Sequence, residues 1–149
     1  MGQLHNRVAL ITGAGRGIGR AIALAYAKVG ARLALAARTR RDLEQTAQAA
    51  QALGASTCIV PMDISDPTQV EDMVRQTVEQ CTTIDILVNN AGMAGPVGPL
   101  QDNDLTAWIQ TIQVNLMGTY LCCRAVLPLM HKQNRGKIIN LSGAGATNA

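Results

Sequence analysis

Residues 12–19 read Thr-Gly-Ala-Gly-Arg-Gly-Ile-Gly, and the fold can be worked out from this stretch. The apolar segment 7–12 ahead of it is typical of a short buried strand, and the Ala-rich segment 18–29 after it is typical of a helix. Glycines between a strand and a helix permit a tight turn and let the backbone approach a pyrophosphate. The start of the helix adds free N–H donors and the positive end of its dipole. We therefore predict a phosphate-binding loop, with ligand contacts from Thr12, Gly13, Gly15, Arg16, Gly17, Ile18 and Gly19.

Strand-length apolar segments and helical patterns alternate along the rest of the chain. Further strands are expected at 33–37, 58–62, 84–88 and 137–141, and helices at 39–53, 66–78 and 104–130. Thr39 and Asp66 stand where helix caps are expected, and Pro67 suits the first helical position. Such alternation predicts an α/β fold with a doubly wound parallel sheet covered on both faces. With no repeat and no linker, residues 1–149 are expected to form a single domain.

Composition excludes several functional classes. The chain has no Phe, one Trp and two Tyr, which argues against a surface on which nucleic-acid bases stack. No apolar run approaches the roughly 18 residues that a membrane span needs. Four cysteines without a Cys-x-x-Cys spacing fit a reducing compartment, so we expect a cytoplasmic protein with small buried thiols. His5 and His131 have no metal-ligand pattern around them, so no metal site is expected.

Charge is distributed unevenly. Eight Lys or Arg residues precede the first acidic residue, Asp42, whereas five basic and ten acidic residues stand from there to the end. Two interpretations remain open on charge alone. The basic part faces an anionic ligand, or it forms a solvated surface.

Two separate motifs give the chain a resemblance to a known family. The pattern Thr-Gly-x-x-x-Gly-x-Gly from Thr12, together with Asn-Asn-Ala-Gly at 89–92, resembles the short-chain dehydrogenase/reductase family. Asp63, Asn115 and the segment 139–142 also match, so the resemblance extends from Val8 to Ser142. It implies a Rossmann-like sheet with strand order 3-2-1-4-5, in which the last strands of the family are absent and the fifth strand is an open edge.

The end of the second strand indicates the cofactor. Members of this fold that bind NAD place a carboxylate there, on the ribose hydroxyls. This chain reads Ala37-Arg38-Thr39, and a guanidinium can grip a 2′-phosphate that a carboxylate would repel. Arg16 resembles the second basic residue of family members that prefer NADP, so we expect NADP(H) to be favoured over NAD(H). The resemblance further places Asp63 and Ile64 beside the adenine, and Asn89, Ala91 and Gly92 along the cofactor.

The catalytic set of the family is only partly present. It consists of Asn, Ser, Tyr and Lys, and Asn115 and Ser142 match the first two. Relatives commonly use the second residue of a Ser-Ser pair, and here that position is Gly143. The family's Tyr-x-x-x-Lys lies beyond the fifth strand, where the sequence stops at Ala149. Tyr120 and Arg124 have a similar spacing inside the preceding helix, but there we expect Tyr120 to pack in the core.

These features predict an NADP-dependent oxidoreductase that transfers hydride between nicotinamide and a carbonyl or secondary alcohol substrate, truncated before its catalytic Tyr and Lys. The alternative is a non-catalytic NADP(H)-binding module or an inactive fragment. We expect no nucleic-acid or membrane partner. In this family the long helix packs on a second subunit, so the resemblance implies a homo-oligomer for full-length members. The residues expected at that contact are Leu116, Met117, Leu121, Val126 and Leu127.

Overall fold

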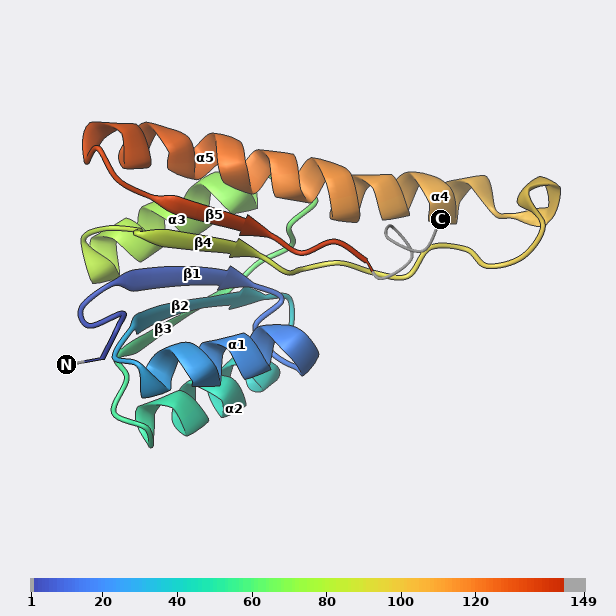
Figure 1. Ribbon diagram of the computed structural model, residues 1–149. Helices are drawn as coiled ribbons and strands as arrows, with labels where there is room; N and C mark the ends of the chain where they lie inside the picture. The colour runs from blue at the N-terminus through green and yellow to red at the C-terminus, as the bar shows by residue number, and fades with distance from the viewer. Residues whose placement is uncertain (1, 144–149) are drawn as a thin grey trace.

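The computed structural model of the protein describes residues 2–143 and contains a five-stranded sheet (Figure 1). Neighbouring strands are all parallel, and their order is β3-β2-β1-β4-β5. The predicted doubly wound order is therefore confirmed. The strands are β1 (Val8–Thr12), β2 (Arg32–Ala37), β3 (Thr57–Pro61), β4 (Ile86–Asn89) and β5 (Lys137–Asn140).

Helices cover both faces of this sheet. Figure 1 shows α1 (Gly17–Lys28) and α2 (Arg40–Gln51) on one face, and α3 (Pro67–Cys81) and α5 (Gly118–Lys132) on the other. The long helix expected at 104–130 contains α4 (Leu105–Ile112), a π-helical turn at Gln113–Met117 and then α5. A short 3₁₀ turn at Leu100–Asp102 lies ahead of α4.

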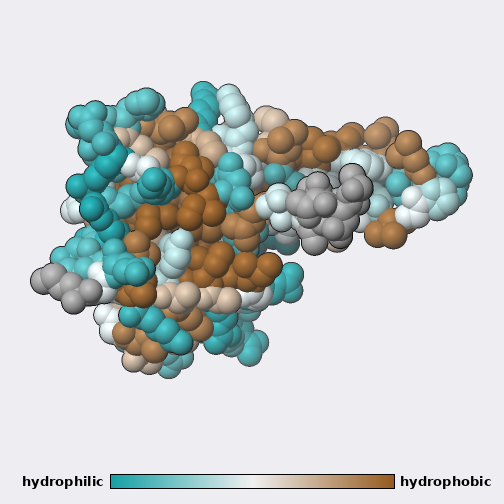
Figure 2. Space-filling view, viewed as in Figure 1, coloured by the Kyte–Doolittle hydropathy of each residue, from teal (hydrophilic) through white to brown (hydrophobic). Residues whose placement is uncertain are grey.

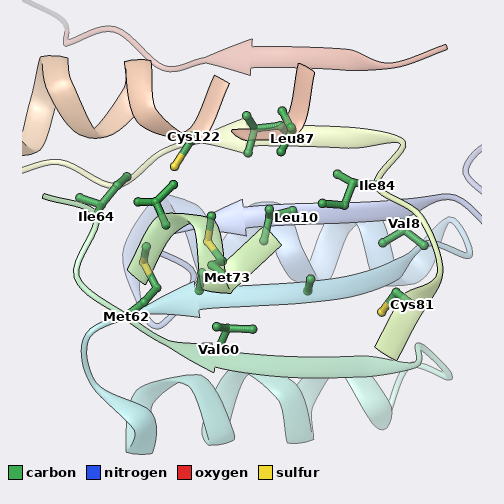
Figure 3. Close-up of a cluster of buried hydrophobic side chains, with 14 of the residues drawn as sticks. Val8, Leu10, Val60, Met62, Ile64, Met73, Cys81, Ile84, Leu87 and Cys122 are labelled. Carbon is green, nitrogen blue, oxygen red and sulfur yellow. The ribbon is translucent and has the colours of Figure 1, made fainter. Parts of the chain in front are cut away.

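Alternate side chains of the central strands supply the two halves of the core. On β1, Val8 and Leu10 face α3 and α5, whereas Ala9 and Ile11 face α1 and α2. All four are fully buried, which is why the strand reads as a continuous apolar run in a parallel sheet. Figure 3 shows the first of these halves, in which Leu10, Val60, Met73 and Leu87 gather.

Only one of the two predicted helix caps forms a capping hydrogen bond. The Asp66 carboxylate accepts from the backbone N–H groups of Thr68 (2.9 Å) and Gln69 (3.2 Å), with Pro67 at the first helical position. Thr39 does precede α2, but its hydroxyl makes no capping hydrogen bond, so that part of the expectation was wrong.

The long helix corrects two expectations about packing. Tyr120 was expected in the core but is 54% exposed. Leu121 and Val126 were expected at a subunit contact, yet both are buried in this chain's own core. The register of α5 explains both results, because the face that carries Leu121, Cys122 and Val126 packs toward α3 and β4 and turns Tyr120 outward.

Exposed apolar side chains continue from α5 along α4, which extends past the ends of the strands in Figure 1. Figure 2 shows hydrophobic residues gathered along this projecting part. The exposed apolar residues of α4 are Leu105, Trp108, Ile109 and Ile112, and α4 has no buried residue. Among residues 2–143, none of the helices combines the length and the apolar character needed to traverse a bilayer.

Candidate nucleotide-binding site

A cavity of about 400 Å³ lies at the carboxyl ends of the strands. Its wall is built mainly from the ends of β1 and β2 and the loops that follow β1, β2, β3 and β4. The chain adds β2 and β3 on one side of β1 and then crosses to place β4 on the other side. Ligands of open α/β sheets bind at such a switch point, so the topology itself favours this cavity as a ligand site.

The glycine loop forms one wall of the cavity through close backbone approaches. Gly13 and Gly17 have φ angles of +64° and +55°, which side chains rarely allow. A Cβ atom on Gly13 would lie 2.9 Å from the Cα of Ala91, and one on Gly15 would lie 2.8 Å from the Cβ of Asp42. A Cβ on Gly17 would meet nothing within 4 Å, because that glycine faces open space at the start of α1. Its backbone is therefore accessible to a ligand.

The start of α1 offers a site for an anion. Arg16 is the N-cap residue, its side chain makes no capping bond, and the first turn carries no acidic residue. The first N–H groups of a helix have no partner within the helix, and the dipole favours negative charge there. The arrangement of loop and helix is thus the one predicted for binding a phosphate group.

Thr12 joins the two sequence motifs by hydrogen bonds. Its buried Oγ accepts from the backbone N–H groups of Asn90 (3.1 Å) and Ala91 (3.0 Å) and donates to the carbonyl of Val88 (3.3 Å). In return, Nδ2 of Asn90 donates to the carbonyls of Thr12 (2.9 Å) and Gly13 (3.2 Å). The glycine loop and the end of β4 are therefore held as one unit, with Thr12 as a positioning residue.

The two neighbouring asparagines have different surroundings. Asn89 is 3% exposed and does not line the cavity. Its Nδ2 donates to Oδ1 of Asn140 on β5 (2.8 Å), and its own Oδ1 has no hydrogen-bond partner within the described residues. Asn90, which was not predicted, lines the cavity instead. The Asn-Asn pair was the available signal, but the sequence does not say which member turns toward the site.

Arginine and aspartate side chains from separate segments line the cavity. Arg16 and Arg38, both predicted, lie on its wall and are exposed. Asp42, near the start of α2, also lines it and was missed. Its contact with Gly15 depends on how α2 docks against the loop, and Thr46 of α2 assists by donating to the carbonyl of Gly15 (3.3 Å).

The loop after β3 supplies Asp63 and Ile64, as predicted, to the same wall. Oδ1 of Asp63 accepts from the hydroxyl (2.7 Å) and the backbone N–H (2.9 Å) of Ser65, and these bonds hold the pKa of Asp63 below its ordinary value. Nearby Arg38 lowers that pKa further. Ile64 packs beneath Gly118, where a Cβ would lie 2.8 Å from the Ile64 side chain.

Asn115 and Ser142 lie outside the cavity wall. Asn115 is in the π-helical turn, where its Oδ1 accepts from the N–H of Met93 and its Nδ2 donates to the carbonyl of Met93, both at 2.9 Å. Because Met93 lines the cavity, Asn115 fixes one of its loops. Ser142 is exposed just after β5.

Most of the predicted cofactor contacts are thus brought together. Those on the wall are Thr12, Gly13, Gly15, Arg16, Gly17, Ile18, Arg38, Asp63, Ile64, Ala91 and Gly92. Gly19 is buried beside Gly13, so it packs behind the loop. The wall residues that were not predicted are Ala36, Ala37, Thr39, Asp42, Met62, Asn90, Met93 and Val114.

The chain is similar to known proteins along nearly its whole length. The model of the short chain dehydrogenase family matches residues 7–149. A short chain dehydrogenase of Monascus purpureus, mpl6, is 40% identical over 148 residues, which cover 95% of this chain and 51% of that protein. The chain therefore spans about half the length of this curated relative.

Solved structures give the same result. A metagenomic short-chain oxidoreductase in complex with NADP superimposes with a TM-score of 0.92 at 36% identity, covering 97% of this chain and 66% of that one. An NAD⁺-bound xylitol dehydrogenase superimposes with a TM-score of 0.94 at 32% identity, covering 99% of this chain and 57% of that one. Solved structures with this fold thus include one bound to NADP and one bound to NAD⁺.

Proposed function

The chain belongs to the short chain dehydrogenase family of oxidoreductases, whose members bind NAD(P), and from that premise we propose that its cavity binds NADP(H) in preference to NAD(H). The observation that carries the proposal is the pair Arg16 and Arg38 on the cavity wall, beside a β2 that ends in Ala37 without a carboxylate. Two guanidinium groups can hold a 2′-phosphate by charge-assisted hydrogen bonds.

The residues present fit a dinucleotide. Gly17 leaves open space where a side chain would stand, and the start of α1, which has no side-chain capping bond, is available to an anion. Asp42 and Asp63 place two negative charges on the same wall, so the two arginines would hold a 2′-phosphate in the presence of two carboxylates. The preference for the phosphorylated cofactor therefore rests on the hydrogen bonds that the two guanidinium groups can form, and both carboxylates would moderate its affinity.

We further propose hydride transfer between nicotinamide and a carbonyl or secondary alcohol substrate. The bound nicotinamide would supply the hydride chemistry. The glycine loop and α1 would hold the pyrophosphate, while Thr12 and Asn90 keep that loop fixed against β4. Asn115 would fix the Met93 loop, and Ser142 would orient the substrate oxygen, on which negative charge develops.

A second function is favoured by the place of the two candidate catalytic residues. Every wall residue lies between 12 and 114, and neither Asn115 nor Ser142 is among them. A chain with this wall can bind a nucleotide without carrying out a reaction. It would then act as an NADP(H)-binding module.

Two further expectations belong to the same proposal. The four cysteines are thiols, which supports a cytoplasmic protein. The exposed side chains of Leu116, Met117 and Leu127 support packing of the long helix on a second subunit.

The test is calorimetric titration of the purified chain with NADPH and, separately, NADH. We expect tighter binding of NADPH, and we expect Arg38→Ala to weaken it by about 10–100-fold, since a hydrogen bond to a charged group contributes about 1.5–3 kcal/mol. NADH binding should change little in the same variant. Arg41→Ala is the matched control, because Arg41 is exposed near the start of α2 and does not line the cavity. Equal affinity for the two cofactors, or equal losses in the two variants, would contradict the assignment.

A further inference from the structure

Two cysteine thiols meet in the core at the end of the sheet opposite the cavity. Cys58 lies on β3 and Cys81 is the last residue of α3, and their sulfur atoms are 3.7 Å apart. They are 8% and 6% exposed. Figure 3 shows Cys81 far along the core from Met62 and Ile64, the two residues of this cluster that line the cavity.

We propose that Cys58 and Cys81 are a thiol-oxidation site, at which a peroxide converts the pair into a reversible intramolecular disulfide. A disulfide requires the sulfur atoms to move from 3.7 Å to about 2.05 Å. Each side chain can supply part of this movement by rotating about its Cα–Cβ bond. Since one cysteine is on a strand and the other ends a helix, the bond would link α3 covalently to β3.

The surroundings make Cys81 the reacting thiol. The hydrogen bond with the Cys58 thiol lowers the pKa of Cys81 to about 7 against the opposing effect of burial, and the positive charge of Arg32 acts in the same direction. Arg32 also donates from Nη1 to the backbone carbonyl of Cys81 (3.3 Å). The same contact and burial raise the pKa of Cys58. The pair is therefore polarised toward a thiolate on Cys81, which is the nucleophilic form.

The chemical steps balance with a peroxide as the oxidant. The Cys81 thiolate attacks one peroxide oxygen, the O–O bond breaks, and the sulfur becomes a sulfenic acid. The other oxygen leaves as hydroxide and takes up the proton that the Cys81 thiol had released, which gives the first water. The sulfur of Cys58 then attacks the sulfur of Cys81, the S–S bond forms, and the hydroxyl group leaves as water with the proton of Cys58. In sum, two thiols and one hydrogen peroxide give one disulfide and two waters.

The other two cysteines provide an internal comparison. Cys122 and Cys123 are adjacent on α5, where consecutive side chains point in different directions. Burial raises the pKa of Cys122 to about 12, which keeps its thiol protonated. Neither position offers the combination of a facing thiol and a thiolate that Cys58 and Cys81 provide.

The experiment exposes the purified chain to hydrogen peroxide near neutral pH, blocks the remaining thiols in denaturant, and maps the peptides by mass. Cleavage after Arg75 and before Asp85 separates Cys58 from Cys81 and Cys81 from Cys122. We expect a Cys58–Cys81 cross-link that dithiothreitol reverses, with Cys122 and Cys123 still open to blocking. The midpoint of thermal unfolding should rise by about 5–10 °C on oxidation, because the bond restricts the unfolded chain.

Variants separate this proposal from simple packing of two small side chains. In Cys58→Ser, which keeps a hydrogen-bond donor beside Cys81 but cannot form the disulfide, Cys81 should accumulate a sulfenic acid that dimedone traps, and the cross-link should disappear. The double variant Cys122→Ala, Cys123→Ala should oxidise like the parent chain. Circular dichroism confirms that each variant is folded. The proposal is overturned if the folded chain keeps both thiols, if Cys81 passes to sulfinic acid beside an unreacted Cys58, or if the cross-link forms only in denaturant.

Discussion

The two edges of the sheet carry strands of similar length in different surroundings. On β3, the residues Cys58 and Val60 are buried, with α2 packed along the strand and α3 covering the other face. On β5, the residue Ile138 packs against the core, while Ile139 is 42% exposed. Among residues 2–143, each of these strands pairs with one neighbour in the sheet.

The difference teaches that apolar sequence and burial are separate properties. Segment 137–141 has the apolar character of a strand, and it pairs with β4 in register, with Asn89 opposite Asn140. Its outer face nevertheless remains open in the part of the chain that the structure describes. Burial of β3 comes from the two helices against it, so we expect apolar packing to hold the β3 edge and polar contacts to hold the β5 edge.

Removal of the Asp85 carboxylate gives the largest expected effect at the β5 edge. Asp85 is buried and accepts from Val8 N (3.0 Å), Arg135 Nε (2.9 Å) and Arg7 Nη1 (3.3 Å). We expect Asp85→Ala to lower the free energy of unfolding by about 3 kcal/mol, because it leaves the buried Val8 N–H and two cations without their acceptor. Urea denaturation measures the change.

Asp72→Ala is the control for that substitution. Asp72 pairs with Arg75 at 2.7 Å on α3, where both side chains are about half exposed. Such a pair contributes at most about 1 kcal/mol. Similar losses in the two variants would mean that the carboxylate of Asp85 does not anchor the β5 edge.

Two matched truncations test the apolar side of the comparison. Val60→Ala on β3 should cost about 2 kcal/mol, since Val60 is fully enclosed. Ile139→Ala on β5 removes a larger side chain but should cost under about 1 kcal/mol, because much of that side chain is already in water. Urea denaturation of both variants under one condition gives the two values. A loss at Ile139 equal to that at Val60 would show that β5 is covered in solution.

Sequence patterns predicted the order and the bounds of these strands, but not which side chains around them are buried. The order 3-2-1-4-5 followed from the resemblance and from the alternation of strands and helices, and the strand bounds differ from the prediction by at most two residues. Periodicity could not tell that Tyr120 faces outward while Leu121 faces inward, because both belong to a helix with apolar residues on more than one side.

At the cavity wall, too, the sequence predicted some residues and missed others. The glycine motif predicted the backbone of the loop, since positive φ angles and close approaches are properties of the glycines themselves. Asn90 and Asp42 were missed because their positions depend on the direction in which β4 ends and on the docking of α2. Local sequence does not contain those tertiary contacts.

A substitution at the centre of the sheet gives a stability loss with which the losses at the two edges can be compared. Thr12→Val removes the hydroxyl that accepts from the N–H groups of Asn90 and Ala91. We expect a loss of about 1–2 kcal/mol in the free energy of unfolding, because two partly buried donors lose their acceptor while shape is kept. NADPH affinity, measured by calorimetry, should fall as well. Thr12→Ser retains the hydroxyl and should preserve the affinity, and a matching loss there would assign the effect to the methyl group.

The smallest expected effect is a pH-dependent change in stability near the β3 edge. Ser65→Ala, in the loop after β3, removes the 2.7 Å hydrogen bond from the Ser65 hydroxyl to Asp63 and keeps the backbone one at 2.9 Å. The pKa of Asp63 should rise toward its ordinary value of 3.8 yet stay below it, because the backbone bond and Arg38 still favour the carboxylate. A nuclear magnetic resonance titration of the Asp63 carboxyl carbon measures this change.

The sign of the stability effect follows from the lowered pKa. A carboxyl whose pKa falls on folding stabilises the folded state above its unfolded pKa, and that contribution is lost as the pH falls through the folded value. Ser65→Ala should therefore cost under about 1 kcal/mol above pH 3.8, and the difference from the parent chain should vanish in stronger acid. Ser56→Ala, at an exposed position before β3, is the matched control. The end of β5 is joined to β4 by the amides of Asn89 and Asn140, which do not titrate. Protection from hydrogen exchange there, corrected for the intrinsic pH dependence of exchange, should therefore not change over the same pH range. An equal loss of protection at β3 and β5 below pH 3.8 would show that protonation of Asp63 does not act on the β3 edge in particular.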